Sequence, residues 1–484
     1  MKLSDLIHDG ISPVSVNGNA AIDITGIAKD SRMIQEGYMF FATSKSSLYI
    51  DDALKRGASV LVTDSETRKP FPCIVIVEDV PRTLGRVASH FNGYPSRRMH
   101  IAGITGTNGK TTITYLIESI LHNAGKQAGV MGTISYRYNG HVLKAENTTP
   151  GAIEIHSLMK DMHASKVKYV AMEVSSHALD QRRVEGVEFD TGIFTNLTHD
   201  HLDYHGDFDH YKAAKKLLFE DYLRNSPKEK KHAILNIDSP VVREFTLEAP
   251  IETLSYSTKG YADAHLIQYG EDINGLKLDI SLMGKKVSVA SPLLGIFNAS
   301  NILASMLYGV TTNIPYEKIK EGIEKLEGVP GRLERVKNAR NVSIFIDYAH
   351  TPDALNNVLT LLNHLKKGRL IVVFGCGGDR DTAKRPVMGD IATNHADLAI
   401  ITSDNPRSEE PLRIIEDIKK GINGKPHKVI ENRKEAIFEA VKLVGENDVL
   451  LVAGKGHEDY QIIGNNTHHF SDREVIEEAL NVAS

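Results

Sequence analysis

The sequence predicts an α/β protein with three domains, and three observations lead to this prediction. The chain has 484 residues, which suggests several cores at roughly 100 to 200 residues per domain. Short apolar runs rich in β-formers alternate with helical patterning along most of the chain, as a mainly parallel sheet requires. The apolar run at 101–105 leads into a glycine-rich turn that opens a helix, which is typical of a nucleotide-binding domain.

The first predicted domain, 1–98, is a small α/β unit. It contains three apolar runs with β character and one helical segment between two of them, at 38–42, 59–63, 73–77 and 51–57 respectively. The polar, proline-containing segment 92–98 is typical of a linker. The glycine-rich turn follows directly after it.

The second predicted domain, 99–331, has the pattern of a mainly parallel sheet. The expected strands lie at 101–105, 169–174, 191–196 and 233–236, and a helix is expected at 110–124. Residues 276–290 alternate as a β segment, and 295–304 indicate a loop that opens a helix. Ligands of such sheets bind at the carboxyl ends of strands, so the polar residues found there are the candidate site residues.

The third predicted domain, 332–484, is a second, Rossmann-like α/β unit. Its expected strands are 343–347, 369–374, 398–402 and 448–453, and each is followed by polar or glycine-rich residues.

Composition limits the classes of function. The chain is 41% hydrophobic and 25% charged with a formal net charge of −5, which is ordinary for a globular protein and gives no reason to expect a nucleic-acid partner. Its two cysteines, Cys73 and Cys376, lack metal-ligand spacing and predict buried, reduced thiols. The amino terminus has no signal pattern, and no run of about 18 apolar residues occurs. We therefore expect a cytoplasmic protein without a membrane partner.

The segment 101–112, IAGITGTNGKTT, predicts a cradle for a triphosphate. Its glycines let successive backbone amides point inward, where they and the start of the helix can bind phosphate oxygens. Lys110 would contact the outer phosphates and the Thr111 hydroxyl would bind magnesium. The pattern departs from the generic Walker form at Ile104, and an ordinary glycine-rich turn is the alternative. The predicted ATP-binding residues of the turn are Gly106, Thr107, Asn108, Gly109, Lys110, Thr111 and Thr112.

Two further groups of polar residues follow strands of the second domain. Glu173 ends an apolar strand, and its carboxylate would suit a hard cation, although it could instead cap the next helix. The segment 196–205, NLTHDHLDYH, holds three histidines and two aspartates. Zinc is the alternative to magnesium there, but no cysteine takes part and the histidine spacing lacks a clear helical context, so we favour magnesium beside ATP.

In its ordered motifs the chain resembles the Mur ligases, the ATP-dependent enzymes that form amide bonds in peptidoglycan precursors. The motifs that carry the resemblance extend through all three predicted domains: GITGTNGKTT, MEVSSH, NLTHDHLDYHG, YKAAK, GIFNASNILA, GRLERV and DYAHTPD. The resemblance implies that Glu173 and His201 are magnesium ligands. It implies that Asn301, Arg332 and Asp347 bind the adenine and ribose side of ATP.

Lys215, in YKAAK, matches a lysine that many Mur ligases carry as a carbamate formed with carbon dioxide. The resemblance implies that this N6-carboxylated side chain holds a second magnesium and that Lys110, Lys215 and His201 are the catalytic residues. Without the resemblance, Lys215 would be interpreted as an ordinary solvated lysine on a helix.

The third domain resembles the Mur ligases that add meso-diaminopimelate. The motifs are FGCGGDRD, SDNPR and AGKGHE. A planar guanidinium can bind the far carboxylate of this amino acid with two parallel hydrogen bonds, which makes Arg407 and Arg380 candidate clamps. Glu458 and the Gly454 carbonyl would pair with its distal ammonium group. The residues that would shape the surrounding loop are Asp404, Asn405 and Pro406.

For the other substrate, UDP-MurNAc-L-Ala-D-Glu, the resemblance implies five binding residues. They are Ser31, Thr148, Thr149, Ser175 and Arg183. The chain departs from the family at 43–49, TSKSSLY, where a glycine-containing loop with Asp-Gly-His is usual. A paralogue that acts on a different carrier is therefore an alternative.

The expected reaction joins the D-glutamate γ-carboxylate to an amine of diaminopimelate through an acyl phosphate, with ATP converted to ADP and phosphate. We expect a monomer that uses small-molecule substrates only. The sequence does not identify the general base, for which Asp347 and His350 are the two candidates. Two rival functions are a regulatory NTPase switch and another ATP-dependent amide ligase, such as a folylpolyglutamate synthase.

Overall fold

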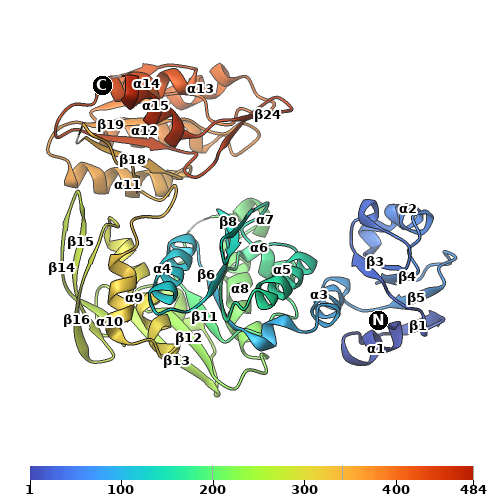
Figure 1. Ribbon diagram of the computed structural model, residues 1–484. Helices are drawn as coiled ribbons and strands as arrows, with labels where there is room; N and C mark the ends of the chain where they lie inside the picture. Colours follow the sequence, from blue (N-terminus) through green and yellow to red (C-terminus); the bar gives the residue numbers. More distant parts are fainter. Residues whose placement is uncertain (199, 341, 483–484) are drawn as a thin grey trace. The chain divides into compact units, whose positions relative to one another are not determined.

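The computed structural model describes residues 1–198, 200–340 and 342–482, and its alternating helices and parallel strands confirm the predicted α/β class (Figure 1). By its internal contacts the chain divides into two compact units. Unit 1 comprises 1–266, 280–287 and 300–323, and unit 2 comprises 267–279, 288–299 and 324–484. The predicted domain bounds 1–98, 99–331 and 332–484 stay a prediction. None of the described helices is long and apolar enough to cross a membrane.

The first part of unit 1 forms a five-stranded sheet in the order β1-β5-β4-β3-β2. Alternate residues of β3 face opposite cores, because Met39 and Phe41 pack in one apolar cluster while Phe40 and Ala42 pack in another. Its strands and α-helices are β1 (Ser15–Gly18), β2 (Gly26–Ala28), β3 (Tyr38–Ala42), β4 (Val60–Thr63), β5 (Cys73–Ile76), α1 (Leu3–Asp9), α2 (Ile50–Lys55) and α3 (Val80–Phe91). The 3₁₀ helices are η1 (Ser31–Met33), η2 (Ser44–Tyr49) and η3 (Pro95–Arg98).

The next sheet has eleven strands in the order β16-β15-β14-β13-β12-β11-β6-β10-β7-β8-β9. Its strands are β6 (His100–Thr105), β7 (Ala128–Met131), β8 (Ser135–Tyr138), β9 (His141–Lys144), β10 (Tyr169–Glu173), β11 (Thr191–Phe194), β12 (Lys231–Asn236), β13 (Ile251–Ser257), β14 (Ala264–Asp272), β15 (Gly275–Leu282) and β16 (Lys285–Ser291). The associated helices are α4 (Lys110–Asn123), α5 (Ala152–Ala164), α6 (Ser176–Asp180), α7 (Leu202–His205), α8 (Phe208–Leu217), the π-helix η4 (Leu218–Leu223), the 3₁₀ helix η5 (Pro240–Glu244), α9 (Ile296–Thr311) and α10 (Tyr316–Glu324).

The strand register in the middle of this sheet determines which side chains meet. β6 is parallel to β10 and β11, with Ile104 opposite Glu173 and Thr105 opposite Phe194. β10 is also parallel to β7, with Met172 opposite Met131. The carboxyl ends of β6, β7, β10 and β11 therefore lie at one edge, where ligands of parallel sheets bind.

Unit 2 contains a six-stranded sheet in the order β17-β18-β22-β19-β20-β21 and the hairpin β23–β24. Leu370, Val372 and Phe374 of β19 pack with α11 to α13, whereas Ile371 and Val373 pack with α14 and α15, so helices cover both faces. The elements are β17 (Glu334–Arg335), β18 (Ser343–Asp347), β19 (Leu370–Phe374), β20 (Leu398–Ile401), β21 (His427–Val429), β22 (Val449–Ala453), β23 (Tyr460–Ile463), β24 (Asn466–His469), α11 (Pro352–Leu365), α12 (Lys384–His395), α13 (Pro411–Lys419), α14 (Arg433–Leu443) and α15 (Asp472–Val482).

Both cysteines are buried with free thiols, as their apolar surroundings predict.

Candidate active site

The glycine-rich turn connects the end of β6 to α4 in unit 1. Gly106 and Gly109 have φ values of 141° and 93°, a backbone region that side chains rarely adopt. A Cβ at Gly109 would lie 2.4 Å from Asn301 Oδ1, so the turn and the predicted ATP residue on α9 approach closely. The turn therefore requires glycine at both positions, for conformation and for space.

The end of β11 holds the turn in place. Thr195 Oγ1 donates to the Asn108 carbonyl at 2.6 Å, and the Asn108 amide donates to Asn196 Oδ1 at 3.0 Å. The hydroxyls of Thr107 and Tyr211 lie 3.0 Å apart. Sequence reasoning did not select Thr195, Asn196 or Tyr211 for the site. Their sequence signals are that Thr195 and Asn196 end the predicted strand 191–196 and that Tyr211 begins the YKAAK motif.

Two lysines converge on one carbonyl of the turn. Lys110 Nζ donates to the Gly106 carbonyl at 2.9 Å, and Lys215 Nζ donates to the same oxygen at 2.8 Å. Lys215 is only 2% exposed, so it is not the solvated helix lysine of the alternative interpretation. Burial, and then the nearby charge of Lys110, lower the pKa of Lys215 well below its ordinary value. An amine in this setting is poised to be neutral.

Glu173, at the end of β10, is buried and its carboxylate is fully engaged. Oε2 accepts from the hydroxyls of Thr111 at 3.0 Å and Thr133 at 2.9 Å, and Oε1 accepts from the Thr133 amide at 2.9 Å. A carboxylate beside a threonine hydroxyl at the start of α4 is an oxygen-donor set of the kind that magnesium prefers. Through these contacts Glu173 is bonded to the turn after β7 and to Thr111. Among the described residues it is Ser175, not Glu173, whose side chain caps the first turn of the following helix α6.

The histidine-rich segment leads into α7, and His199 lies outside the described residues. His201 has a φ of 55°, and its ring lies 4.8 Å from that of His177, centroid to centroid. His205 Nε2 lies 3.0 Å from Ser176 Oγ. Burial lowers the pKa of His177 to about 4 and also lowers that of His201, which favours neutral imidazoles able to act as ligands. Among the described residues, no group of three or more His, Cys, Asp or Glu side chains is placed to hold a metal ion.

Four of the residues predicted to bind the UDP-linked substrate lie near Glu173. Thr149 Oγ1 donates to the Glu173 carbonyl at 2.8 Å, and the Ser175 amide donates to Thr149 Oγ1 at 3.0 Å. Arg183 Nη1 donates to the Thr149 carbonyl at 3.1 Å. The Thr148 hydroxyl lies 3.1 Å from that of Thr133. Ser31, the fifth, is buried at the start of η1 in the five-stranded sheet's part of unit 1.

In unit 2, Asp347 ends β18 and is bound by backbone amides. Its oxygens accept from the Leu333 amide at 2.6 Å and the Ala349 amide at 2.8 Å. Burial raises the pKa of Asp347 against the opposing effect of Arg332. The Arg332 guanidinium lies 5.0 Å from the Tyr348 ring centroid, and its Nε is buried without a hydrogen-bond partner among the described residues. Such an arginine has an unused donor for a ligand.

The loop that contains the predicted diaminopimelate residues is anchored to the β23–β24 hairpin. Asn405 Oδ1 accepts from the Ile462 amide at 3.0 Å, and Asn405 Nδ2 donates to Glu458 Oε2 at 2.9 Å. Arg407 has a φ of 53°, and its amide donates to the Ile462 carbonyl at 3.1 Å. These bonds gather Asn405, Arg407 and Glu458.

The two candidate clamps differ in their surroundings. Arg407 Nη1 donates to the Gly378 carbonyl at 2.7 Å, so its side chain already crosses to the loop that follows β19. Arg380, on that loop, is exposed, and its Nη1 bonds only to the carbonyl of its neighbour Asp379 among the described contacts. Asp404 is buried beside Gly454, where a Cβ would lie 2.7 Å from Asp404 Oδ2, and Gly454 has a φ of 113°.

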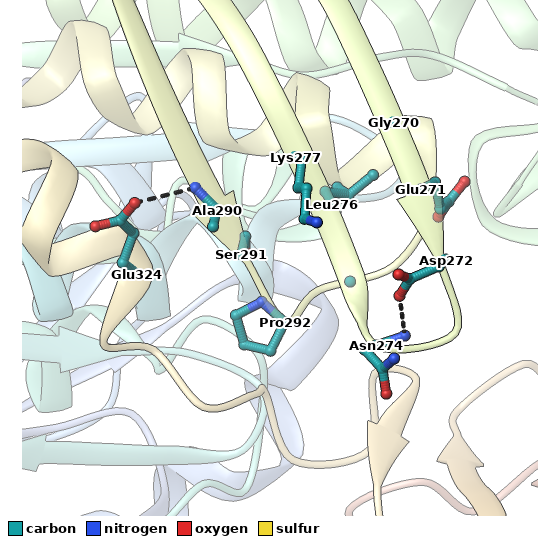
Figure 2. A pocket seen from close by; sticks show the side chains of 11 residues that line it. Gly270, Glu271, Asp272, Asn274, Leu276, Lys277, Ala290, Ser291, Pro292 and Glu324 are labelled. Atoms are coloured by element: carbon teal, nitrogen blue, oxygen red, sulfur yellow. Dashed lines mark hydrogen bonds between the residues drawn. The ribbon is translucent and has the colours of Figure 1, made fainter.

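A pocket of ≈ 570 Å³ in unit 2 is separate from these residues (Figure 2). The bonds from the Ala290 amide to Glu324 and from the Asn274 amide to Asp272 occupy carboxylate oxygens at its wall. Its lining, all within the described part of the chain, includes none of the residues predicted for catalysis or binding.

Comparisons with known proteins agree with the geometry. Residues 104–309 match the Mur ligase middle domain, and residues 331–456 match the Mur ligase glutamate ligase domain. The chain is 43% identical to a UDP-N-acetylmuramoyl-L-alanyl-D-glutamate--2,6-diaminopimelate ligase of Clostridium tetani, with 99% of both chains covered. It is 41% identical to the protein of the same name from Geobacter metallireducens, over 99% of this chain and 98% of that one.

A solved structure of a protein with this name has a TM-score of 0.73 to the chain at 30% identity, with 100% of this chain and 99% of that chain covered. The ordered motifs, the two matching domains and the full-length relatives lead to one conclusion: this chain belongs to the Mur ligase family.

Proposed function

We propose that this chain is an ATP-dependent ligase that joins meso-diaminopimelate to the D-glutamate of UDP-MurNAc-L-Ala-D-Glu, a step of peptidoglycan precursor synthesis. The observation that carries the proposal is the 43% identity over 99% of the chain to a ligase named for these two substrates. One edge of the eleven-stranded sheet supports it. There the glycine-rich turn 106–109, from here on called the phosphate turn, meets the buried Glu173 carboxylate and several hydroxyl-bearing residues.

The first chemical step is phosphoryl transfer from ATP to the γ-carboxylate of D-glutamate. An unactivated carboxylate does not react with an amine, whereas an acyl phosphate carries a good leaving group. The turn 106–109, the start of α4 and Lys110 would bind the phosphates and offset negative charge as the γ-phosphoryl group moves. Asn301, next to the turn, would bind the adenine and ribose side of ATP. The same role is proposed for Arg332 and Asp347.

Magnesium fits the residues of this edge. We propose Thr111, Glu173 and His201 as its protein ligands, because a buried carboxylate, a hydroxyl and a neutral imidazole each offer a lone pair to a cation. When bound, the cation would neutralise charge between the phosphate oxygens and the acceptor carboxylate.

We propose that Lys215 is carboxylated by carbon dioxide. A neutral ε-amine attacks the carbon of CO₂, an N–C bond forms and one proton leaves, so a carbamate replaces the amine. The burial of Lys215 and its proximity to Lys110 support this, because both favour the neutral amine that the reaction needs. The carbamate would add a carboxylate beside the phosphate turn for a second magnesium.

In the second step the amine of diaminopimelate attacks the acyl phosphate, and phosphate leaves. We propose that Arg407 and Arg380 bind the far carboxylate, that Glu458 and the Gly454 carbonyl bind the distal ammonium group, and that Asp404, Asn405 and Pro406 hold the loop. The bonds that join Asn405 to Glu458 and to the hairpin support this assignment. Ser31, Thr148, Thr149, Ser175 and Arg183 would bind the UDP-linked dipeptide.

Of the two candidate bases, the surroundings favour His350. Both oxygens of Asp347 already accept backbone amides. His350 Nδ1 lies 2.8 Å from the Tyr348 carbonyl, which requires the proton on Nδ1 and makes Nε2 the basic nitrogen.

We also propose a monomer in the cytoplasm, since the chain itself supplies residues for all three substrates and ATP is a cytoplasmic substrate.

The decisive test measures phosphate release with substrates exchanged one at a time. We expect turnover only when ATP, UDP-MurNAc-L-Ala-D-Glu and meso-diaminopimelate are all present, and at most weak turnover with L-lysine. A rate of ATP hydrolysis that does not depend on either of the other substrates would indicate a regulatory NTPase. Turnover with a folate acceptor and glutamate would indicate a folylpolyglutamate synthase.

The Arg407→Ala variant tests the amine side. Loss of a charge-assisted hydrogen-bond pair worth about 1.5–3 kcal/mol should raise the KM for diaminopimelate by about 10- to 100-fold. The KM for ATP should change little. An equal rise in both KM values would show that Arg407 serves only the fold of its loop, through its bond to Gly378.

A further inference from the structure

The turn after β7 fits closely around the Glu173 carboxylate. A Cβ at Gly132 would lie 2.3 Å from Glu173 Oε1, so only glycine leaves room for the carboxylate in its observed position. The next residue, Thr133, binds both carboxylate oxygens, one through its amide and one through its hydroxyl, each at 2.9 Å. Glu173 therefore has little freedom to rotate away from Thr111.

The Thr133 hydroxyl also contacts Thr148, so it faces two oxygen acceptors. An ionised carboxylate can only accept, so the Thr133 hydroxyl is the donor in its bond to Glu173 Oε2. Thr133 Oγ1 is also placed to donate to Thr148 Oγ1 at 3.1 Å, so this one hydroxyl stands between the carboxylate and Thr148. The result is a continuous chain of bonds from Thr148 through Thr133 to Glu173.

This chain of bonds connects two ligand sites. Thr148 is half-buried and stands among the residues assigned to the UDP-linked dipeptide, and Thr111, bonded to Glu173 Oε2 at 3.0 Å, begins the helix of the phosphate turn. Thr133 lies between them and belongs to neither assignment. A group in this place can transmit the occupancy of one site to the orientation of a ligand at the other.

We infer that Thr133 is a positioning residue, which holds the Glu173 carboxylate toward the cation and couples binding of the UDP-linked dipeptide to cation affinity. The inference rests on the proposed function, because it uses the assigned roles of Thr148 and Glu173. The coupling is reciprocal: the dipeptide strengthens cation binding, and the cation strengthens dipeptide binding by the same factor.

Direct Mn²⁺ binding tests the inference without turnover. Mn²⁺ is titrated into the full-length protein with a non-hydrolysable ATP analogue and followed by electron paramagnetic resonance, with and without UDP-MurNAc-L-Ala-D-Glu. In the wild type the dipeptide should raise Mn²⁺ affinity by about 5-fold or more. Thr133→Val, which keeps the shape and the amide but loses the hydroxyl, should weaken Mn²⁺ binding by about 10-fold and abolish the effect of the dipeptide.

Thr133→Ser should restore both properties, which a loss of packing alone would not explain. Thr191→Val is the matched control, since Thr191 is a fully buried threonine of the same sheet whose hydroxyl has no hydrogen-bond partner among the described residues. It should bind Mn²⁺ as the wild type does. Gly132→Ala is a second variant, which should weaken Mn²⁺ binding because its methyl group displaces the carboxylate.

Wild-type affinity in Thr133→Val, no rescue in Thr133→Ser, or a dipeptide effect that survives in Thr133→Val would each overturn the inference. Failure of the proposed function is seen separately, as wild-type protein that releases no phosphate with diaminopimelate and the UDP-linked dipeptide.

Discussion

Lys215 differs from the neighbouring lysines of α8 because its side chain is buried. Lys212 and Lys216 on the same helix form ion pairs with Glu244 and Glu220, whereas Lys215 points into the protein and bonds to the Gly106 carbonyl. The difference is one of helical phase. Lys215 follows buried Tyr211 by four residues and precedes buried Leu218 by three, so all three share the inner face.

Carboxylation of Lys215 can be observed directly. Protein equilibrated with ¹³C-bicarbonate should give a carbamate carbon resonance that is absent in Lys215→Gln, and Lys216→Gln should keep it. Lys215→Gln should also lose most of its ligase activity, because it cannot supply the second carboxylate. A resonance that persists in Lys215→Gln would place the carbamate elsewhere or show that none forms here.

His156 predicts a pH dependence of stability. It is fully buried, its Nε2 lies 2.9 Å from the Glu185 carbonyl, and burial lowers its pKa from 6.5 to about 4. Above pH 6.5 the ring is neutral in both folded and unfolded chains, so its contribution is complete. Between pH 6.5 and 4 only the unfolded chain takes up the proton, so stability falls, by about 1.4 kcal/mol at pH 5.5.

The His156→Gln variant should lose less stability than the wild type between pH 7.5 and 5.5, measured as the change in Tm, even if it is less stable at pH 7.5. His141→Gln removes an exposed histidine of unit 1 and should leave the wild-type pH dependence unchanged. Identical pH dependence in all three proteins would show that His156 does not contribute to acid sensitivity.

At the scale of elements, α14 and α15 are joined by two ion pairs in opposite environments. Arg433 and Asp472 are completely buried with a 2.7 Å contact, and the Arg433 guanidinium also donates to the Ala453 carbonyl at the end of β22. Lys434 and Glu478 connect the same helices at the surface, where both are about half exposed. The two contacts have similar lengths, 2.7 and 2.8 Å, but the pair that is buried and bidentate should contribute more to stability than the exposed one.

Asp472→Asn leaves a buried arginine without its counter-charge and should lower the free energy of unfolding of unit 2 by about 3–5 kcal/mol. Glu478→Gln breaks the exposed pair and should cost about 0–1 kcal/mol. Urea unfolding followed by circular dichroism measures both. Similar losses in the two variants would contradict the dependence on burial.

The elements also show what could be predicted from sequence. Apolar runs and turn chemistry predicted the main strands and the helix after the phosphate turn, and the full-length relatives confirm the family. The predicted β segment 276–290 is in fact two strands, β15 and β16, joined by a turn at Met283 and Gly284. The hairpin β23–β24 went unpredicted, since its strands are short and mostly polar or exposed.

Contacts within the site were less accessible to sequence reasoning. Thr133, Thr195 and Tyr211 meet the predicted residues only because β6, β7, β10, β11 and α8 come together in space, and no local pattern encodes that meeting. Arg407 was expected solely as a clamp, yet its amide and guanidinium both also hold its own loop. The roles assigned to the site residues remain predictions for experiment.

At the scale of the whole molecule, each unit brings one part of the proposed chemistry. Unit 1 contains the phosphate turn, Glu173 and the hydroxyl groups assigned to the UDP-linked dipeptide, and unit 2 contains the loop assigned to the amine. Both parts serve the same intermediate, since the acyl phosphate formed from the dipeptide is the electrophile that the amine attacks. The proposed chemistry therefore requires that the γ-carboxylate of D-glutamate is phosphorylated.

Tracing of carboxylate oxygen shows whether this phosphorylation occurs. UDP-MurNAc-L-Ala-D-Glu labelled with ¹⁸O in the γ-carboxylate is converted with ATP and meso-diaminopimelate, and the released phosphate is analysed by mass spectrometry. We expect one ¹⁸O atom in each phosphate released with product, because the carboxylate oxygen that attacks phosphorus departs with it. Product formation with unlabelled phosphate would show that the γ-carboxylate is not phosphorylated.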